Sequence, residues 1–280
     1  MSTKQKSGLW TMTKGEFEES VFALEKAIVK QGGNPRDLFN LFRTDGEYAG
    51  RIAQAMMRKG LVGSIESRMA RMVLGRNIFD VADWMSYYDA KFTKKQLRDA
   101  GKFPWGEDVL NSTCPLCGKT VKDCHFAFLG LDHLNGKPLT ILKLQELHSI
   151  TAQPRFYSYT PDAWYSREKF VTDITMDLRW YLLHTNIVPK SEGKTFDEQK
   201  AMLPAEYEVP SAITEVSKDL LVFKKTGVYA NLSRYGRCTD VDSDGDRVSV
   251  GHFFAVGLHV GDYWDVSRVD ILGVSASRKF

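Results

Sequence analysis

The chain has 280 residues, of which 43% are hydrophobic and 26% charged, and its net charge is +3. This length fits one or two globular domains, and the composition excludes a disordered, collagen-like or coiled-coil chain. No apolar run approaches the ~18 residues of a membrane span, and the segment from Met1 to Leu9 contains no apolar signal core. We therefore expect a soluble, cytoplasmic protein without a membrane span.

The charge distribution indicates two parts. Basic residues outnumber acidic ones over 1–104, whereas acidic residues outnumber basic ones over 105–280. We predict an α+β protein with a helical domain over 1–104, followed by a ligand-binding domain over 105–280. The four cysteines are too few for a disulfide scaffold, so we expect reduced thiols.

The first part has the pattern of a small helical bundle. Apolar residues recur at helical spacing, glycines end several of the stretches, and Thr13–Glu16 and Thr93–Gln96 match capping boxes. The predicted helices cover residues 13–31, 48–59, 65–74, 78–88 and 93–100.

Basic side chains on these helices allow an alternative function in nucleic-acid binding through the N-terminal domain. No recognition-helix motif is evident, and packing of the helices as a scaffold is the favoured explanation of the pattern. The residues that would contact phosphates are Arg51, Arg58, Lys59, Arg68, Arg71 and Arg76.

A Cys-x-x-Cys motif makes zinc a candidate cofactor. Cys114 and Cys117 have the spacing with which two thiolates hold one tetrahedral ion. A structural zinc needs four ligands, and no second Cys-x-x-Cys occurs. The alternative is a turn with two free thiols. The residues that could complete the ligand set are Cys124, His125, His133 and His148.

From residue 125 onward the pattern changes to short apolar runs. These predict strands over 125–131, 138–147, 155–159 and 177–184. Helices are predicted over 196–202 and after Pro210, the second ending before Gly227. Only strands and loops are expected after Gly227.

A calcium loop is suggested by Asp240, Asp242, Asp244 and Gly245, which match the start of the D-x-D-x-D-G pattern. The twelfth position is Gly251, where an EF-hand needs glutamate, so an EF-hand is excluded. A looser calcium site remains one interpretation. The other is an acidic turn between two strands, with Gly245 supplying a positive φ.

The last 34 residues, 247–280, are unusual in composition. Lys, Glu, Gln, Met and Trp make up 58 of the 280 residues, so about seven are expected here, but only Trp264 and Lys279 occur. No codon that ends in cytosine encodes these five types. The residues at the irregular positions are all reachable from the asparagine codon AAC by changing its two adenines. A turn-rich β segment that is poor in Lys and Glu is the structural alternative.

The fixed residues of this segment form a frame. It consists of Arg247-Val248-x-Val250-Gly251, Gly257-Leu258-x-Val260, Arg268 and Leu272-Gly273-Val274, and it continues to Arg278. This frame resembles the variable region of target proteins of diversity-generating retroelements. The resemblance implies a C-type-lectin-like domain of the formylglycine-generating-enzyme type. It also implies that an error-prone reverse transcriptase, mutating adenines, rewrites the end of the gene.

On this resemblance, twelve positions form a variable ligand-binding surface, and the apolar frame residues between them form the core. Trp264 is expected to be a fixed packing anchor, and Arg268 to pair with Asp270. The predicted core residues are Val248, Val250, Phe253, Leu258, Val260, Leu272 and Val274. The predicted variable positions are Ser249, His252, Phe254, Val256, His259, Gly261, Asp262, Tyr263, Val266, Ser267, Val269 and Ile271.

We therefore predict a non-catalytic protein that binds a protein or other macromolecular ligand through its C-terminal surface. No common catalytic motif is present, and only Cys238 lies near the place where formylglycine-generating enzymes carry a cysteine pair. The main alternative is nucleic-acid binding through the basic helices and a zinc knuckle. A fold-related enzyme with degenerate chemistry is a third possibility.

Overall fold

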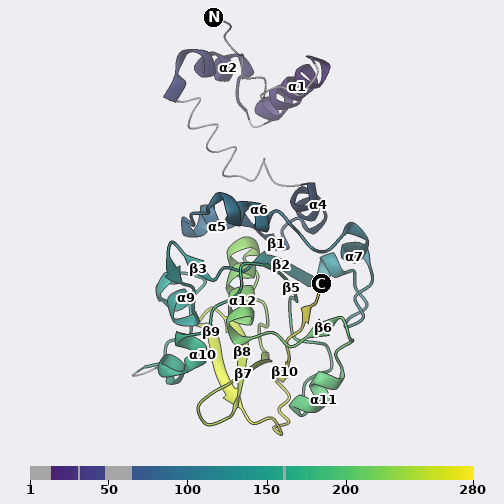
Figure 1. Cartoon of the computed structure of the whole chain (residues 1–280), viewed down its shortest axis with the longest axis vertical. Helices are drawn as coiled ribbons and strands as arrows, with labels where there is room; N and C mark the ends of the chain where they lie inside the picture. Colours follow the sequence, from purple (N-terminus) through teal and green to yellow (C-terminus); the bar gives the residue numbers. More distant parts are fainter. Residues whose placement is uncertain (1–13, 31, 48–64, 160–161) are drawn as a thin grey trace, which may run out of the picture. The chain divides into compact units, whose positions relative to one another are not determined.

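The computed structural model describes residues 14–30, 32–47, 65–159 and 162–280 (Figure 1). The chain divides into two compact units, residues 1–59 and 60–280. The predicted helix over 48–59 lies outside the described residues.

The observed boundary differs from the one predicted after residue 104. The segment between 65 and 104 places Leu74, Trp84 and Phe103 in the same hydrophobic core as the strands that follow. Its helices therefore belong to the second unit and do not form a separate bundle.

In the first unit, α1 (Lys14–Lys30) confirms the first predicted helix. A second helix, α2 (Pro35–Thr44), was not predicted. Its N-terminus is capped locally, because the Asn34 side chain accepts from the Arg36 amide and Pro35 occupies the first helical position.

The second unit combines helices and sheets, which confirms a mixed α+β class. No helix within the described residues has both the length and the apolar character needed to cross a bilayer. Its helices are α4 (Ile65–Leu74), α5 (Val81–Tyr88), α6 (Lys94–Ala100), α7 (Glu107–Asn111), α8 (Val121–Cys124), α9 (Ile141–Leu147), the 3₁₀ helix η1 (Trp164–Arg167), α10 (Lys169–Thr172), α11 (Phe196–Ala201) and α12 (Ala212–Thr226). Its strands are β1 (Ile78–Phe79), β2 (His125–Leu129), β3 (His133–Leu134), β4 (Lys137–Pro138), β5 (Trp180–His184), β6 (Tyr207–Glu208), β7 (Tyr235–Val241), β8 (Arg247–Phe254), β9 (Gly257–Tyr263), β10 (Leu272–Val274) and β11 (Ser277–Arg278).

Two larger sheets organise this unit, beside the short β3–β4 hairpin. The first has the order β1-β2-β5-β11-β6, and the second has the order β10-β7-β8-β9. In the second sheet β10 runs parallel to β7, whereas β8 is antiparallel to both β7 and β9. The whole segment 247–280 thus forms strands and connecting loops, as predicted.

Most predicted elements of the second unit are present, with three differences. The strand predicted over 138–147 is largely helix α9, whose Thr140 side chain caps the amide of Lys143. Residues 155–159 make a single bridge, Phe156 to Leu258, and no full strand. The helix predicted over 78–88 is divided into β1 and α5, because Asp80 forms a capping box with Asp83 and starts a new helix there.

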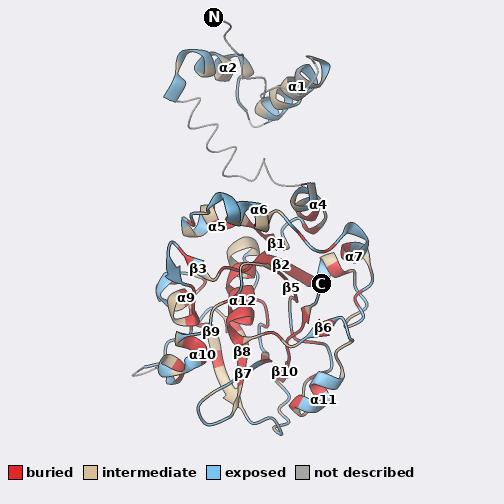
Figure 2. Ribbon diagram, in the orientation of Figure 1, coloured by how far each residue is buried: buried red, intermediate tan, exposed pale blue. Residues whose placement is uncertain are grey.

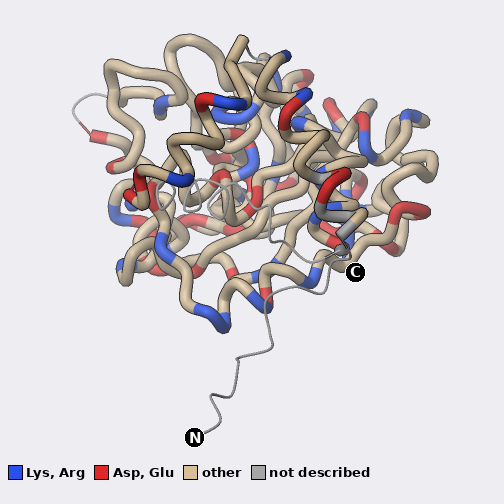
Figure 3. The backbone as a smooth tube through the Cα atoms, turned by 90° about the horizontal axis from the view of Figure 1, so that it is seen from above, with Lys and Arg blue, Asp and Glu red and all other residues tan. Residues whose placement is uncertain are grey.

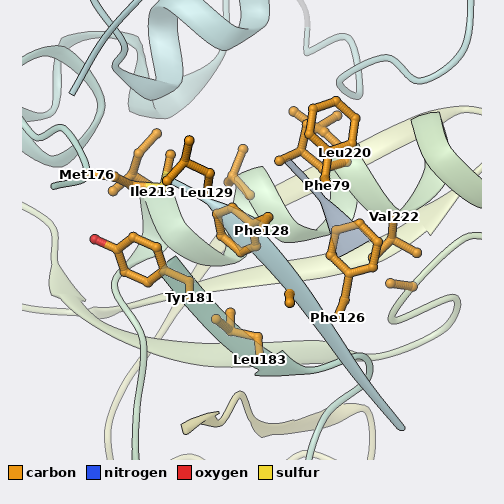
Figure 4. Close-up of a cluster of buried hydrophobic side chains, with 14 of the residues drawn as sticks. Phe79, Phe126, Phe128, Leu129, Met176, Tyr181, Leu183, Ile213, Leu220 and Val222 are labelled. Carbon is orange, nitrogen blue, oxygen red and sulfur yellow. The ribbon is translucent and has the colours of Figure 1, made fainter. Parts of the chain in front are cut away.

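Helix α12 lies at the centre of the core and contacts strands of both sheets (Figures 1 and 2). All residues from Ala212 to Val222 are buried. Figure 4 shows Ile213 of α12 near Leu129 of β2 and Leu220 of α12 near Phe79 of β1, in the same cluster as Phe128 of β2 and Leu183 of β5. This one helix therefore packs against strands of both sheets.

Helix α12 also carries a buried charged network, which bonds to the segment after β5 and to the segment before β7. Lys218 and its partners Glu215 and Asp219 have completely buried side chains, with Nζ–O distances of 2.7 and 2.8 Å. The Lys218 ammonium also donates to the carbonyl of Thr185 at 2.9 Å, just after β5. The Asn231 amide donates to Glu215 Oε1 at 2.8 Å. Hydrogen bonding on several sides is what makes burial of these charges tolerable.

This network predicts a pH-dependent stability. Burial raises the pKa of Asp219 from 3.8 to about 7. The folded state then retains a proton that the unfolded state has released, so this contribution to stability is present below about pH 4 and is lost as the pH rises to about 7. We expect Asp219→Asn to remove it, changing the difference in unfolding free energy between pH 5 and pH 8 by on the order of 1–4 kcal/mol. Urea unfolding of both proteins at the two pH values measures this.

The matched control is Asp99→Asn, which removes an exposed carboxylate 3.5 Å from Lys102 and should leave the pH dependence unchanged. Equal pH dependence of wild type and Asp219→Asn would show that Asp219 is ionised in the folded protein.

Candidate functional site

The C-terminal sheet separates buried frame residues from accessible ones. All seven predicted core residues have 0% relative exposure. Along β9 the alternation of Leu258 and Val260 with His259 and Gly261 follows from the two-residue period of a strand. The core of this segment was therefore predicted correctly.

Eleven of the twelve predicted variable positions are accessible to solvent. Val256 and Val266 are exposed, and the other nine are half-buried. Ser249 is the exception, because its side chain is completely buried opposite Arg237 in the β7–β8 pairing. The prediction that Ser249 belongs to the surface is wrong, since it cannot contact a ligand from this position.

Four of the accessible positions belong to a half-buried aromatic surface, defined here as Tyr157, Tyr159, Tyr235, His252, Phe254, His259 and Tyr263. The rings of Tyr157 and His259 stack with centroids 4.0 Å apart. Those of Tyr235 and His252 stack at 5.3 Å, and Phe254 meets His252 edge-on at 4.9 Å. Aromatic side chains offer large, rigid contact area at small entropic cost.

Three members of the aromatic surface were missed from the sequence, namely Tyr157, Tyr159 and Tyr235. A backbone pairing brings the first two to β9, since the Tyr157 amide donates to the Leu258 carbonyl at 2.9 Å. Gly257 permits this approach, because a Cβ there would lie 2.4 Å from the Phe156 carbonyl carbon. The only local clue was the Tyr-Ser-Tyr spacing, which puts two rings on one side of an extended chain.

The imidazoles of this surface retain unused polar atoms. His252 Nδ1 and His259 Nε2 are buried and have no hydrogen-bond partner. Burial lowers the pKa of His259 to about 4, with a smaller contribution from His252, so its ring is neutral at pH 7. A neutral imidazole carries one donor and one acceptor, so each of these rings retains a polar atom beneath the surface that no described residue binds.

The loop between β9 and β10 is held through its backbone. The buried Arg237 guanidinium donates to the carbonyls of Trp264 and Ser267, each at 2.9 Å. It also donates to Lys194 O and Gln199 Oε1 at 3.0 Å. Further along the loop, the Gly193 amide donates to the Val269 carbonyl. Side chains in the loop are not needed for these bonds.

Two predictions about this loop are wrong. Trp264 is 67% exposed and is not a packing anchor, because its backbone carbonyl rather than its ring is held. Arg268 pairs with Glu198 at 2.8 Å and not with Asp270.

A cluster of metal-ligating side chains lies at a different place. The Sγ atoms of Cys114, Cys117 and Cys124 and a ring nitrogen of His184 all lie within 4.8 Å of one another. Hydrogen bonding from Cys124 lowers the pKa of Cys114 to about 5, and the same contact raises the pKa of Cys124. These four residues could hold a metal ion.

The other proposed zinc ligands are not in this cluster. His125 stacks edge-on against His184, and its Nε2 interacts with the Tyr207 hydroxyl at 3.0 Å. His148 contacts Tyr88, and His133 pairs with Asp132. Sequence reasoning included Cys124 as a candidate but missed His184, which lies in a strand of the sheet.

The predicted calcium set is not assembled. Asp240 accepts from the Ala212 amide at 2.6 Å at the start of α12. Within the described residues, Asp242 groups with Asp246 and Asp262, and Asp244 is not part of that group. Asp242 accepts from the amides of Asp244 and Asp246, and Gly245 has φ +89°. These contacts form the acidic turn between two strands, and the separate group of Asp242, Asp246 and Asp262 could hold a metal ion.

Of the six basic helical residues proposed to contact phosphates, the structure describes three, and two of these are engaged within the protein. Arg71 pairs with Asp80, and Arg76 donates to the carbonyls of Lys225 and Thr226. Arg68 is exposed, whereas Arg51, Arg58 and Lys59 lie outside the described residues. Figure 3 shows Lys and Arg interspersed with Asp and Glu over the described chain.

Comparison of the chain with protein-family models, with curated proteins and with solved structures gives no significant match.

Loss of Arg237 should loosen the loop over 264–271. Arg237→Met leaves three acceptors without a donor, because only the Trp264 carbonyl keeps another bond, from the Ser267 amide. We expect the change to lower the unfolding free energy by about 3 kcal/mol or more. Amide exchange over 264–271 should accelerate in the same variant. Urea unfolding and hydrogen–deuterium exchange measure the two effects.

Arg268→Met is the matched control, because it removes an exposed ion pair from the same loop and should cost less than about 1 kcal/mol. Similar results for the two variants would contradict the role assigned to Arg237.

Proposed function

We propose that this chain is a non-catalytic binding protein with a C-type-lectin-like domain. Its C-terminal surface would be diversified by a retroelement and would bind a protein or other macromolecular ligand. The observation that carries the proposal is a division of roles within residues 247–274. Frame side chains maintain the fold, whereas the accessible positions between them make no polar bond on which the fold depends.

The frame side chains are engaged throughout. Arg247 binds the carboxylate of Asp265 through two bonds of 2.9 Å, and Arg268 binds Glu198. By contrast, within the described part of the chain the side chains at the eleven accessible positions make no ion pair and no hydrogen bond to another residue, and Asp262 bonds only to its own backbone. Side chains at such positions can change without leaving a buried partner unsatisfied.

The aromatic surface favours recognition of a large ligand. Tyrosine and tryptophan are enriched where proteins bind other macromolecules, because each buries much area with few rotatable bonds. Tyr157, Tyr159 and Tyr235 lie outside the predicted variable positions and would give constant contact area. His252, Phe254, His259 and Tyr263 would give the contacts that differ between variants.

The proposal predicts a second copy of the coding segment in the source DNA. We expect a near-copy of the codons for residues 247–280 close to the gene, differing at adenines, beside a gene for a reverse transcriptase. AAC should stand in the copy at the variable positions. Sequencing the DNA downstream of the gene tests this, and absence of both elements from the flanking DNA would overturn diversification.

The proposal also predicts unequal tolerance of neighbouring positions. Tyr263→Asn and Val266→Asn should each change the unfolding free energy by less than about 1 kcal/mol, since neither side chain has a polar partner. Val260→Asn should cost more than about 3 kcal/mol, because it buries an amide in the core. Urea unfolding measures all three, and equal losses would contradict the division of roles.

A further inference from the structure

Cys114 and Cys117 lie in a tight knuckle after α7. The Cys114 amide donates to the Lys119 carbonyl at 2.7 Å, and the Gly118 amide donates back to the Cys114 carbonyl at 2.9 Å. Gly118 has φ +76°, a conformation that glycine adopts without strain. Thr113 and Thr120 close the turn with an antiparallel bridge. Both thiols are thus directed from one short, rigid loop.

Two further ligands come from other elements. Cys124 ends α8 with its side chain buried, and His184 ends β5 and is 5% exposed. Together with the knuckle they supply three sulfur atoms and one imidazole nitrogen from three separate places in the fold. A structural zinc site has four such ligands.

The state of His184 points to a ligand independently of the cysteines. Its Nδ1 lies 2.7 Å from the carbonyl of Asn186, so Nδ1 carries the proton and donates. Its Nε2 is then an acceptor, and this atom is buried without a hydrogen-bond partner among the described residues. Metal-binding histidines characteristically donate the distal N–H to a carbonyl in this way. An unused buried lone pair otherwise costs about 1–3 kcal/mol.

We propose that Cys114, Cys117, Cys124 and His184 bind one structural zinc ion. Three thiolates and an imidazole are a soft donor set that suits zinc rather than calcium or magnesium. Beyond the ligands, the Tyr207 hydroxyl lies 3.8 Å from Cys114 Sγ and also interacts with His125. An adjoining cavity of about 560 Å³ is lined by Cys117, Cys124 and His184 and gives the ion a route of entry.

The ion would join the knuckle to the first sheet. α7 contacts α4, so this connection also ties α4 to β5. The proposal is independent of the ligand-binding function, because the cluster involves none of the residues of the aromatic surface.

The experiment uses the full chain, purified under reducing conditions, incubated with zinc and then dialysed. We expect one zinc ion per chain by elemental analysis. Replacement by cobalt(II) should give the visible absorption of a tetrahedral site with three sulfur ligands and one nitrogen. His184→Ala and Cys117→Ser should lower zinc affinity by at least about 10-fold, since they remove direct ligands.

His184→Cys is the decisive variant, because it should retain zinc and shift the cobalt spectrum to that of four sulfur ligands. Cys238→Ala and His133→Gln are matched controls outside the cluster and should keep one zinc. A wild-type chain that binds no zinc, or that contains a Cys114–Cys117 disulfide under reducing conditions, would overturn the proposal. Full zinc content in both His184→Ala and Cys117→Ser would do so too. Where a variant fails to fold, the wild-type cobalt spectrum decides.

Discussion

The C-terminal surface depends on the hydrogen bonds that the buried guanidinium of Arg237 donates to the loop after β9. A buried cation is costly, and here neutral oxygens surround it: the carbonyls of Lys194, Trp264 and Ser267 and the side chain of Gln199. Burial lowers the pKa of this group, yet an arginine remains protonated at any physiological pH. Because its partners in the loop are main-chain atoms, these bonds do not depend on which side chains the loop carries. A fixed backbone is the condition for a surface whose residues can change.

The charged network on α12 acts at the other end of the same sheet. Lys218 and Glu215 position Asn231, whose carbonyl in turn accepts from the Phe253 amide. The bond to Asn231 thus fixes the last residues of β8, in the same way that the bonds from Arg237 fix the loop after β9. Both supports lie in the part of the chain before residue 247. Side chains at the proposed variable positions can therefore change without altering these two supports.

Local patterns predicted the features that depend on local physics. The period of two identified the buried residues of β8 and β9, but it could not show that Ser249 faces Arg237 across the β7–β8 pair. The mainly apolar run over 138–147 is compatible with either a strand or a helix. The Thr140 side chain caps the first turn, and the segment forms helix α9. Tyr157, Tyr235 and His184 reach their sites through strand pairings between distant segments. No spacing in the sequence encodes such contacts, and for that reason they were missed.

Backbone conformation sets the limit of side-chain exchange on this surface. His252 has φ +45°, in the left-handed region that most residues avoid. Asparagine, aspartate and glycine tolerate it, whereas valine and isoleucine have a branched Cβ that crowds the chain there. On the proposed diversification, an AAC codon in the template would specify asparagine, the side chain well suited to this backbone. Adenine changes would also yield isoleucine and valine, which carry a conformational cost at 252 that they would not carry at Val256 or Val266. Fewer of the encoded side chains are therefore tolerated at His252, where β8 bends, than at Val256 or Val266.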